Sequence, residues 1–328
     1  MDSTGSIVVD DKGTTLSYRD SGAASTPVYT TFFVIHGLGF TSAIFSRIAD
    51  QGRLKGLRIV AINRRGYKGS TPYSPEEIAE LTEGDDKTKA AFWKMVGMHV
   101  AIFIYQFIQK ESPPPVLSDF SNGGVVLLGW SAGSTFSAAT IAHIDSLPED
   151  VQRRLTSYIC GHIIQELSRV PYNQLWLTSY FDHGDLSTRN LDVLEYMVPS
   201  ADRAPSMYNM SKKEKAEFIE ASSETNGFEL AILAGCFPQL NAIYKKALFG
   251  KTQKQRFSGG LKTTFIVGDR TLSLVLAALW SVQDDDRENG GGNVKSMIIA
   301  GAITLSIGTI QRERSMPIWM HRLSQSEE

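Results

Sequence analysis

The sequence predicts an α/β protein with a doubly wound, mostly parallel sheet and a helical cap inserted after the sixth strand. Continuous apolar runs end in glycine-rich turns at 28–39, 57–66 and 125–133, which is typical of strands buried on both faces. Segments with helical spacing of apolar residues, such as 87–109, alternate with these runs;. Residues 167–260 are aromatic-rich and mostly helical in pattern, which predicts the cap.

The first half of the chain supplies a hairpin and two parallel strands. Short β-branched runs at 6–10 and 14–19 flank Asp-Asp-Lys-Gly, so an opening hairpin is expected;. Parallel strands are predicted at 28–35 and 57–63. The helix at 87–109 should end before the following run of three prolines;.

The second half supplies the remaining strands, expected at 125–129, 158–165 and 263–267. The small residues of 132–142 suit a helix packed closely on the sheet, and the acidic, glycine-rich stretch 283–293 is interpreted as a solvated loop;. In a doubly wound sheet, ligands bind at the carboxyl ends of the strands. Candidate functional residues are therefore expected in the turns that follow the strands.

Length and composition favour one large core, 1–166 with 261–328, and one cap, 167–260;. The net charge of -2 offers no basic surface for nucleic acid, and two cysteines fit a reducing compartment;. The start of the chain lacks a secretory signal pattern, and the apolar run 297–310 is too short to span a bilayer;. We expect a cytoplasmic protein without membrane span, metal or cofactor; its oligomeric state cannot be predicted.

The strongest motif is Gly129-Trp130-Ser131-Ala132-Gly133, a G-x-S-x-G pentapeptide between an apolar strand and a helical pattern. Small residues on both sides of the serine permit a strained turn that exposes its hydroxyl above the sheet. A glycine-rich turn without function is the competing interpretation. The position between strand and helix favours Ser131 as a nucleophile.

A second turn, His36-Gly37-Leu38-Gly39, also follows an apolar strand. Amide groups here and directly after a nucleophile can converge on a developing oxyanion, so Leu38 and Ala132 are the predicted donors. His36 and Gly37, like Trp130 beside the serine, are expected to border the binding site. We interpret His36 as shaping the turn and not as a catalytic base.

The segments FFVIHGLGF, RRGYKGSTPYS and GGVVLLGWSAGS together resemble the α/β-hydrolase superfamily, particularly members common in fungi. The resemblance spans most of the chain outside the cap. It implies an esterase, lipase, lactonase or epoxide hydrolase with a serine or aspartate nucleophile, an acid after strand six or seven, and a histidine after strand eight. A serine at the nucleophile position argues against the epoxide-hydrolase type, which uses aspartate.

Two carboxylates are candidates for the acid that the resemblance implies. The usual position, a few residues past strand seven, holds Thr271 here, next to Asp269. Asp269 directly follows a glycine, which suggests a turn-capping carboxylate. Glu166 ends strand six, where some lactone-hydrolysing relatives place their acid, and we expect it to lie nearer to Ser131 than Asp269 does.

The histidine that the resemblance implies is absent. The last family strand, near 297–301, should lead into Gly-x-x-His, but the chain continues Gly301-Ala302-Ile303-Thr304. A serine without a base is a poor nucleophile. Other histidines lie on predicted core elements or in the tail, namely His99, His143, His162 and His321. His183 in the cap is the one stand-in, although packing is its more common role.

The absent histidine suggests a shifted reading frame from about Ile303. Ile-Thr-Leu can be encoded ATC ACT TTG, and one preceding A converts this to AAT CAC TTT, which encodes Asn-His-Phe. Continued through ITLSIGTIQRERSMPIW, the same shift gives NHFVHWDDPERAIDAYL, which resembles the family's histidine loop and a terminal amphipathic helix. The third base of each codon can be chosen freely, but the residues fix the first and second bases of nearly every codon. True divergence of an inactive member is the alternative.

The leading functional hypothesis is a cofactor-independent serine hydrolase for a small apolar ester or lactone-like substrate. Cap aromatics would line its pocket, although aromatics at helical spacing are more often core: Tyr172, Trp176, Tyr180, Phe181, Tyr196, Tyr208 and Phe218;. The alternatives are a non-catalytic ligand-binding protein and a natural-product cyclase on the same scaffold. Fold resemblance alone cannot separate these classes.

Overall fold

The computed structural model describes residues 3–119, 122–165, 177–220, 229 and 235–303. The strands in this part of the chain form one eight-stranded sheet in the order β1-β2-β4-β3-β5-β6-β7-β8. They are β1 (Ser3–Val8), β2 (Thr15–Asp20), β3 (Thr30–Ile35), β4 (Leu57–Ile62), β5 (Val125–Trp130), β6 (Ile159–Gln165), β7 (Lys262–Gly268) and β8 (Val294–Ile299).

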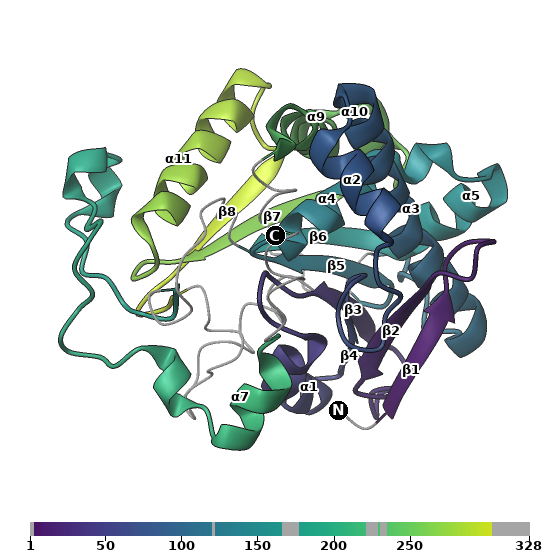
Figure 1. Ribbon diagram of the computed structural model, residues 1–328, viewed down its shortest axis with the longest axis horizontal. Coiled ribbons are helices and arrows are strands. Elements are labelled where there is room, and N and C mark those ends of the chain that lie inside the picture. Colours follow the sequence, from purple (N-terminus) through teal and green to yellow (C-terminus); the bar gives the residue numbers. More distant parts are fainter. Residues whose placement is uncertain (1–2, 120–121, 166–176, 221–228, 230–234, 304–328) are drawn as a thin grey trace.

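The sheet is parallel from β4 across to β8, and β1 and β2 extend it antiparallel at one edge. Figure 1 shows β1 and β2 in purple at that edge and β8 in yellow at the other. In the hairpin turn, the Asp10 carboxylate accepts the amides of Lys12 and Thr14, at 3.0 and 2.8 Å. The predicted fold class, a mostly parallel sheet with an opening hairpin, is confirmed.

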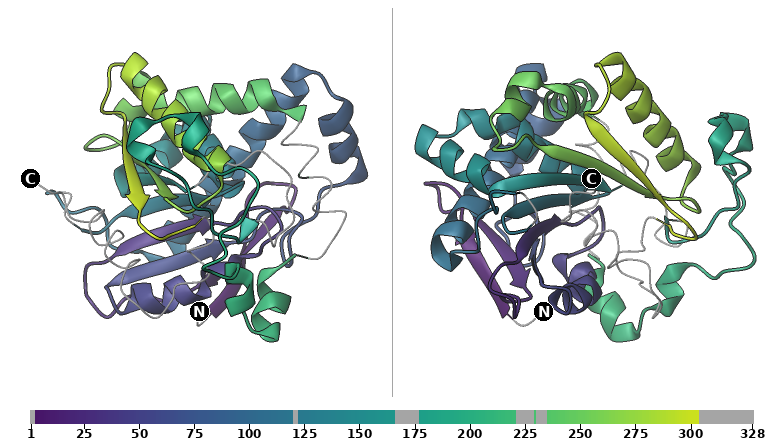
Figure 2. Two further views of the ribbon diagram at one scale, coloured as in Figure 1. Left: turned by 90° about the vertical axis from the view of Figure 1, so that its left-hand side faces the viewer. Right: turned by 180° about the vertical axis from the view of Figure 1, so that it is seen from behind.

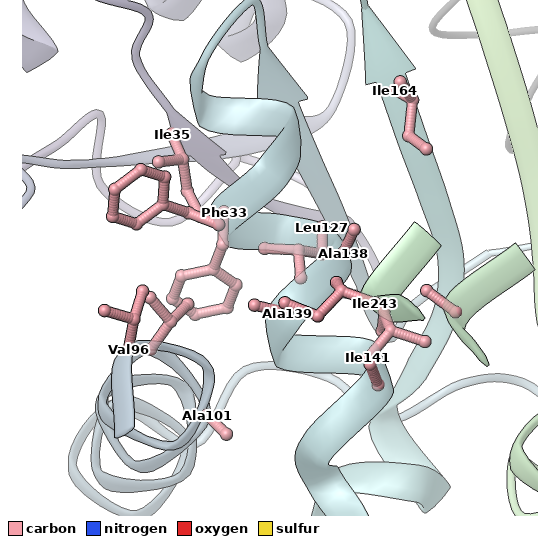
Figure 3. Close-up of a cluster of buried hydrophobic side chains, with 14 of the residues drawn as sticks. Phe33, Ile35, Val96, Ala101, Leu127, Ala138, Ala139, Ile141, Ile164 and Ile243 are labelled. Carbon is pink, nitrogen blue, oxygen red and sulfur yellow. The ribbon is translucent and has the colours of Figure 1, made fainter. Parts of the chain in front are cut away.

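Helices cover both faces of the sheet, because alternate strand residues point to opposite sides. In β3, Phe33 and Ile35 join the apolar cluster on one face, and Phe32 and Val34 join the cluster on the other. The first, the α4 face, is covered by α3 (Asp86–Glu111), α4 (Gly133–His143), α5 (Glu149–Tyr158), α9 (Phe237–Phe249) and α11 (Ser273–Glu288) (Figures 2 and 3). The second, the α1 face, is covered by η1 (Ser42–Phe45), α1 (Ser46–Arg53) and α7 (Lys212–Phe218).

The long helix α3 begins where Asp85 caps it, with its carboxylate accepting the Thr88 amide at 2.8 Å. It crosses α4 closely, since a Cβ on Gly97 would stand 2.3 Å from the Ala139 carbonyl oxygen. Within the described residues it is the one helix long and apolar enough to cross a membrane, but 61% of its apolar window is buried in the protein. The packing accounts for its apolar character as a core helix.

The stretch 283–293 is a solvated loop only in its second part, so that expectation was wrong for 283–288. Helix α11 continues to Glu288, because the polar residues of 283–288 are compatible with a helix and the first glycine of this stretch is Gly290;. The acidic side chains are also used: Tyr244 donates to Asp285 at 2.8 Å. Asp286 accepts the amides of Gly292 and Asn293, at 2.9 and 2.8 Å, and so closes the turn before β8.

The described parts of the predicted cap behave differently from one another. Helix α9 contributes Leu240, Ile243 and Leu248 to the same cluster as α3 and α4. By contrast, 177–220 passes along the carboxyl ends of the strands, and α7 lies near α1 (Figure 1). The division into a core and a cap of 167–260 stays a prediction.

Candidate active site

Ser131 occupies a strained turn between β5 and α4, as its motif predicts. Its φ of 52° lies in the left-handed region, which a non-glycine residue adopts at a cost;. The flanking glycines leave room for this turn. A Cβ on Gly129 would stand 2.4 Å from Ser134 Cα, and one on Gly133 would stand 2.2 Å from the Ile35 carbonyl oxygen. Backbone atoms close both positions to any larger residue.

The turn is fixed by hydrogen bonds and is accessible at its apex. The Ser131 amide donates to the Gln165 carbonyl at the end of β6, at 2.7 Å. The Ser134 hydroxyl donates to the Gly129 carbonyl at 2.8 Å. Trp130 and Ala132 are buried, whereas Ser131 between them is half-buried. A rigid scaffold thus presents one partly exposed hydroxyl at the carboxyl end of the sheet.

The turn after β3 packs directly on this serine. A Cβ on Gly37 would lie 2.9 Å from Ser131 Cβ, so only glycine permits the approach without a shift. Among the described residues, neither the Leu38 nor the Ala132 amide donates to another protein group. Two amides beside the serine that are free to bind a ligand are what an oxyanion site requires.

His36 is held inside this loop and shapes it. Its Nε2 accepts the Arg64 amide at 3.1 Å, so Nδ1 carries the proton and donates to the Gly37 carbonyl at 3.0 Å;. Burial, together with the Arg64 guanidinium, holds the pKa of His36 well below its usual range. His36 is therefore neutral, and both ring nitrogens are engaged.

Of the two candidate acids, one is described. The Asp269 carboxylate accepts the Gly301 amide at 2.7 Å, so it holds the turn after β8. Its own amide donates to Ile299 at 3.2 Å. Thr271, at the usual acid position, is buried. Glu166 lies outside the described residues, and its expected place nearer to Ser131 stays a prediction.

Two of the described core histidines, His99 and His162, have structural partners. His99 Nε2 lies 3.2 Å from the Asp10 carboxylate in the opening hairpin. His162 Nε2 lies 3.0 Å from the Ser137 hydroxyl, and burial lowers the pKa of His162 to about 3. Burial also lowers the pKa of His143 to about 4. His321 lies outside the described residues.

His183 is also fully engaged. Its Nδ1 accepts the Glu195 amide at 2.9 Å, so Nε2 carries the proton and donates to the Thr271 carbonyl at 2.7 Å;. In this arrangement the ring has no free acceptor for a proton from Ser131. It ties 177–220 to the turn after β7, and the neighbouring Phe181 amide donates to the Arg270 carbonyl at 3.0 Å.

An apolar cluster on the α1 face includes Trp130, the residue before the serine. Phe40, from the turn after β3, lies 5.1 Å from Trp130 between ring centroids. Tyr180 and Phe218 are buried in the same cluster, and so is Ile303 after β8. The other aromatics of the predicted cap lie elsewhere or are not described: Tyr196 and Tyr208 are exposed, Phe181 packs in the α4-face cluster, and Tyr172 and Trp176 lie outside the described residues. Their role in a pocket stays a prediction.

No family model matches this sequence, and no curated protein matches it significantly. Solved structures do. A laboratory-evolved variant of potato epoxide hydrolase is 12% identical over 98% of this chain and 97% of that chain, with a TM-score of 0.53. The epoxide hydrolase of Vigna radiata is 11% identical over 98% of this chain and 96% of that chain, with a TM-score of 0.49. The thioesterase domain of the curacin biosynthetic pathway is 14% identical over 98% of this chain and 99% of that chain, also with a TM-score of 0.49. The chain has the α/β-hydrolase fold.

Proposed function

We propose that this protein belongs to a line of serine hydrolases that cleave a small apolar ester, lactone or related acyl substrate. The observation that carries the proposal is Ser131 itself, half-buried at a φ of 52° between β5 and α4. Strain of this kind persists where the surrounding structure enforces it, and it is concentrated at functional sites. Ser112 and Arg189 also have positive φ values, so the proposal depends on the strain together with the position of Ser131 in a turn between strand and helix.

In this proposal Ser131 attacks the acyl carbon, and the Leu38 and Ala132 amides stabilise the resulting oxyanion. Both amides lie in turns adjacent to the serine, and Gly37 packs against its Cβ. A histidine must accept the serine proton and return it to the leaving group. Neither His36 nor His183 can do so in its present hydrogen bonding, since both ring nitrogens of each are engaged.

We place the base in the shifted frame. The turn that would precede it is already built, because Asp269 holds the Gly301 amide and the Arg270 amide donates to the Ala302 carbonyl at 3.0 Å. Ile303 follows at once and is 1% exposed within the α1-face cluster that includes Trp130. The string NHFVHWDDPERAIDAYL holds two histidines, and the first of them is its second residue, at the carboxyl edge of the sheet.

The same segment would supply a cover for the end of the sheet. On the α1 face, Met297, Ile299 and Cys160 are only partly buried at the border of the cluster. A helix from the shifted frame would present alanine, isoleucine, tyrosine and leucine at helical spacing, which suits such a face. This supports the shifted frame independently of the missing base.

The acid is Glu166 or Asp269. Glu166 directly follows Gln165, whose carbonyl binds the Ser131 amide. Asp269 binds the turn from which the proposed histidine would continue. An acid must hold Nδ1 of the base, and either position satisfies the topology. The substrate's acyl part would meet Phe40, Tyr180 and Phe218, so we expect an apolar group there;.

A non-catalytic ligand-binding protein or a cyclase is the second candidate. The observation that favours it is that the two histidines in question, His36 and His183, have both ring nitrogens engaged. Such a protein would keep the pocket and would not activate Ser131. It predicts that no version of the chain forms an adduct at this serine.

The test is labelling with a fluorophosphonate probe, with the adduct located by mass spectrometry. Two proteins are compared, the chain as written and the shifted-frame protein, in which one A precedes the codon of Ile303; each is paired with an S131A control. We expect rapid labelling at Ser131 in the shifted-frame protein only. Equal, slow labelling of both versions and both controls would support the non-catalytic alternative.

A further inference from the structure

A buried ion pair lies under the turn that carries Leu38. Arg64, just after β4, binds Glu229 through both guanidinium Nη atoms, with Nη2 2.9 Å from Oε2. Their side chains are 2% and 7% exposed. The Tyr67 hydroxyl donates to the same carboxylate at 2.7 Å. Burying two charges is costly, and removal of one partner costs more than removal of both.

The pair is attached to the turn after β3 at both ends. Arg64 Nη2 donates to the Gly37 carbonyl at 3.0 Å. The Gly39 amide donates to the Tyr67 hydroxyl at 3.2 Å. His36 Nδ1 gives the Gly37 carbonyl a second hydrogen bond, at 3.0 Å. The residues on both sides of Leu38 are thus fixed by one network.

The Gly37 carbonyl and the Leu38 amide belong to the same planar trans peptide, so they point in opposite directions. A donor that holds the carbonyl therefore also sets where the amide hydrogen points. We propose that Glu229, through Arg64 and Tyr67, positions the Leu38 amide toward Ser131; this inference rests on the proposed hydrolase function. Without the network, the peptide can turn its carbonyl toward the developing oxyanion.

The charge of Arg64 adds to this geometry. A cation at the carbonyl polarises the peptide and makes its amide a better donor. Arg64 is kept in place by stacking, with its guanidinium carbon 4.7 Å from the Tyr67 ring centroid and 4.6 Å from that of Phe136. Glu229 is a positioning residue in this scheme, because it touches the turn only through its two partners.

The network also links the turn to the predicted cap, in which Glu229 lies. A second link joins the other side of the turn to 217–220. The Glu220 amide donates to the Gly39 carbonyl at 2.9 Å, and the Thr41 amide donates to the Phe218 carbonyl at 2.7 Å. Two separate parts of the predicted cap, Glu229 and 217–220, therefore hold the turn after β3. Orientation of the Leu38 amide therefore depends on contacts with two parts of the predicted cap.

The neighbouring pair Arg65–Glu77 provides a matched control. Arg65 binds Glu77 through two nitrogens, at 2.8 and 2.9 Å. Arg65 also donates to the Pro72 carbonyl at 2.8 Å and lies over the Tyr73 ring, 4.3 Å from its centroid, and neither group belongs to the turn after β3. E77Q therefore breaks the arginine–glutamate pair of the next residue on the loop without releasing Gly37 or Gly39.

The experiment measures amide exchange of the peptide 36–40 and unfolding stability in the chain as written. We expect E229Q and Y67F to speed exchange there at least tenfold, and E77Q to leave it unchanged. The double variant R64M/E229L should regain stability relative to E229Q, since no charge stays buried, while exchange stays fast. Recovery of slow exchange together with stability in the double variant would overturn the proposal.

A second arm uses the shifted-frame protein and its labelling rate constant. Loss of one oriented oxyanion donor should lower this constant by about 10²-fold or more in E229Q and R64M/E229L, with E77Q unchanged. Unchanged labelling in the two network variants would overturn the proposal. If the parent shifted-frame protein does not label, the hydrolase function fails, whereas the exchange arm still decides whether the network fixes the turn.

Discussion

Replacing Ser131 by glycine should stabilise the protein while it removes the nucleophile. A left-handed φ of 52° costs a non-glycine residue about 1–2 kcal/mol, which glycine avoids;. Glycine loses about 0.5–1 kcal/mol through its greater freedom in the unfolded chain. The expected net gain for S131G is therefore about 0–1.5 kcal/mol. S131A removes the hydroxyl but keeps the strain, so it should gain little.

Ser112 supplies the matched control. It ends α3 with a φ of 45°, also in the left-handed region. S112G should stabilise by a similar amount without any effect on labelling. Chemical denaturation of the parent, S131G, S131A and S112G gives the free energies of unfolding, and probe labelling in the shifted-frame protein gives the reactivity. A destabilised S131G beside a stabilised S112G would refute the claim that strain is stored at the elbow.

Three further predictions concern the turn, the pH and the acid. G37A should cost about 1–3 kcal/mol of stability, because the added Cβ must displace the nucleophile or the turn;. The same variant should slow labelling of the shifted-frame protein. G52A is the control, since its Cβ would lie 3.3 Å from a side-chain carbon, and it should have neither effect. Burial lowers the pKa of His162 to about 3, whereas a histidine in the unfolded chain has a pKa of about 6.5. The unfolded state therefore takes up a proton first, and the free energy of unfolding falls as the pH drops from about 6.5 toward 3. H162Q should flatten this dependence in denaturation midpoints measured across that range, and an unchanged slope would contradict the argument. In the shifted-frame protein, E166Q should slow labelling more than D269N does, and the opposite order would assign the acid to Asp269.

The sheet was predictable because each buried strand is a continuous apolar run that ends at a glycine-rich turn. The limits of α11 and β8 were not. β8 runs Val294–Ile299 and starts before the strand expected at 297–301. In the stretch 283–288 the polar composition suggested a loop, but contacts from distant side chains such as Tyr244 support a helix there.

The elbow and the oxyanion turn were predictable because their glycines are required by local backbone geometry. The Arg64–Glu229 pair was not predictable, since its members lie 165 positions apart and no periodicity joins them. The RRGYKGSTPYS segment gave a signal for Arg64 and Tyr67 only as part of a family resemblance. Exposure of Tyr196 and Tyr208 shows why aromatic content alone cannot identify a pocket lining.

The most direct test of the central claim is the nucleotide sequence of the genomic locus and its transcript. The account predicts codons after that of Ala302 which, with one added base, encode NHFVHWDDPERAIDAYL or a closely similar string. It also predicts that this base is present in an independently sequenced transcript. Confirmed codons whose neighbouring frame gives no histidine at this position would contradict the account and leave the non-catalytic alternative.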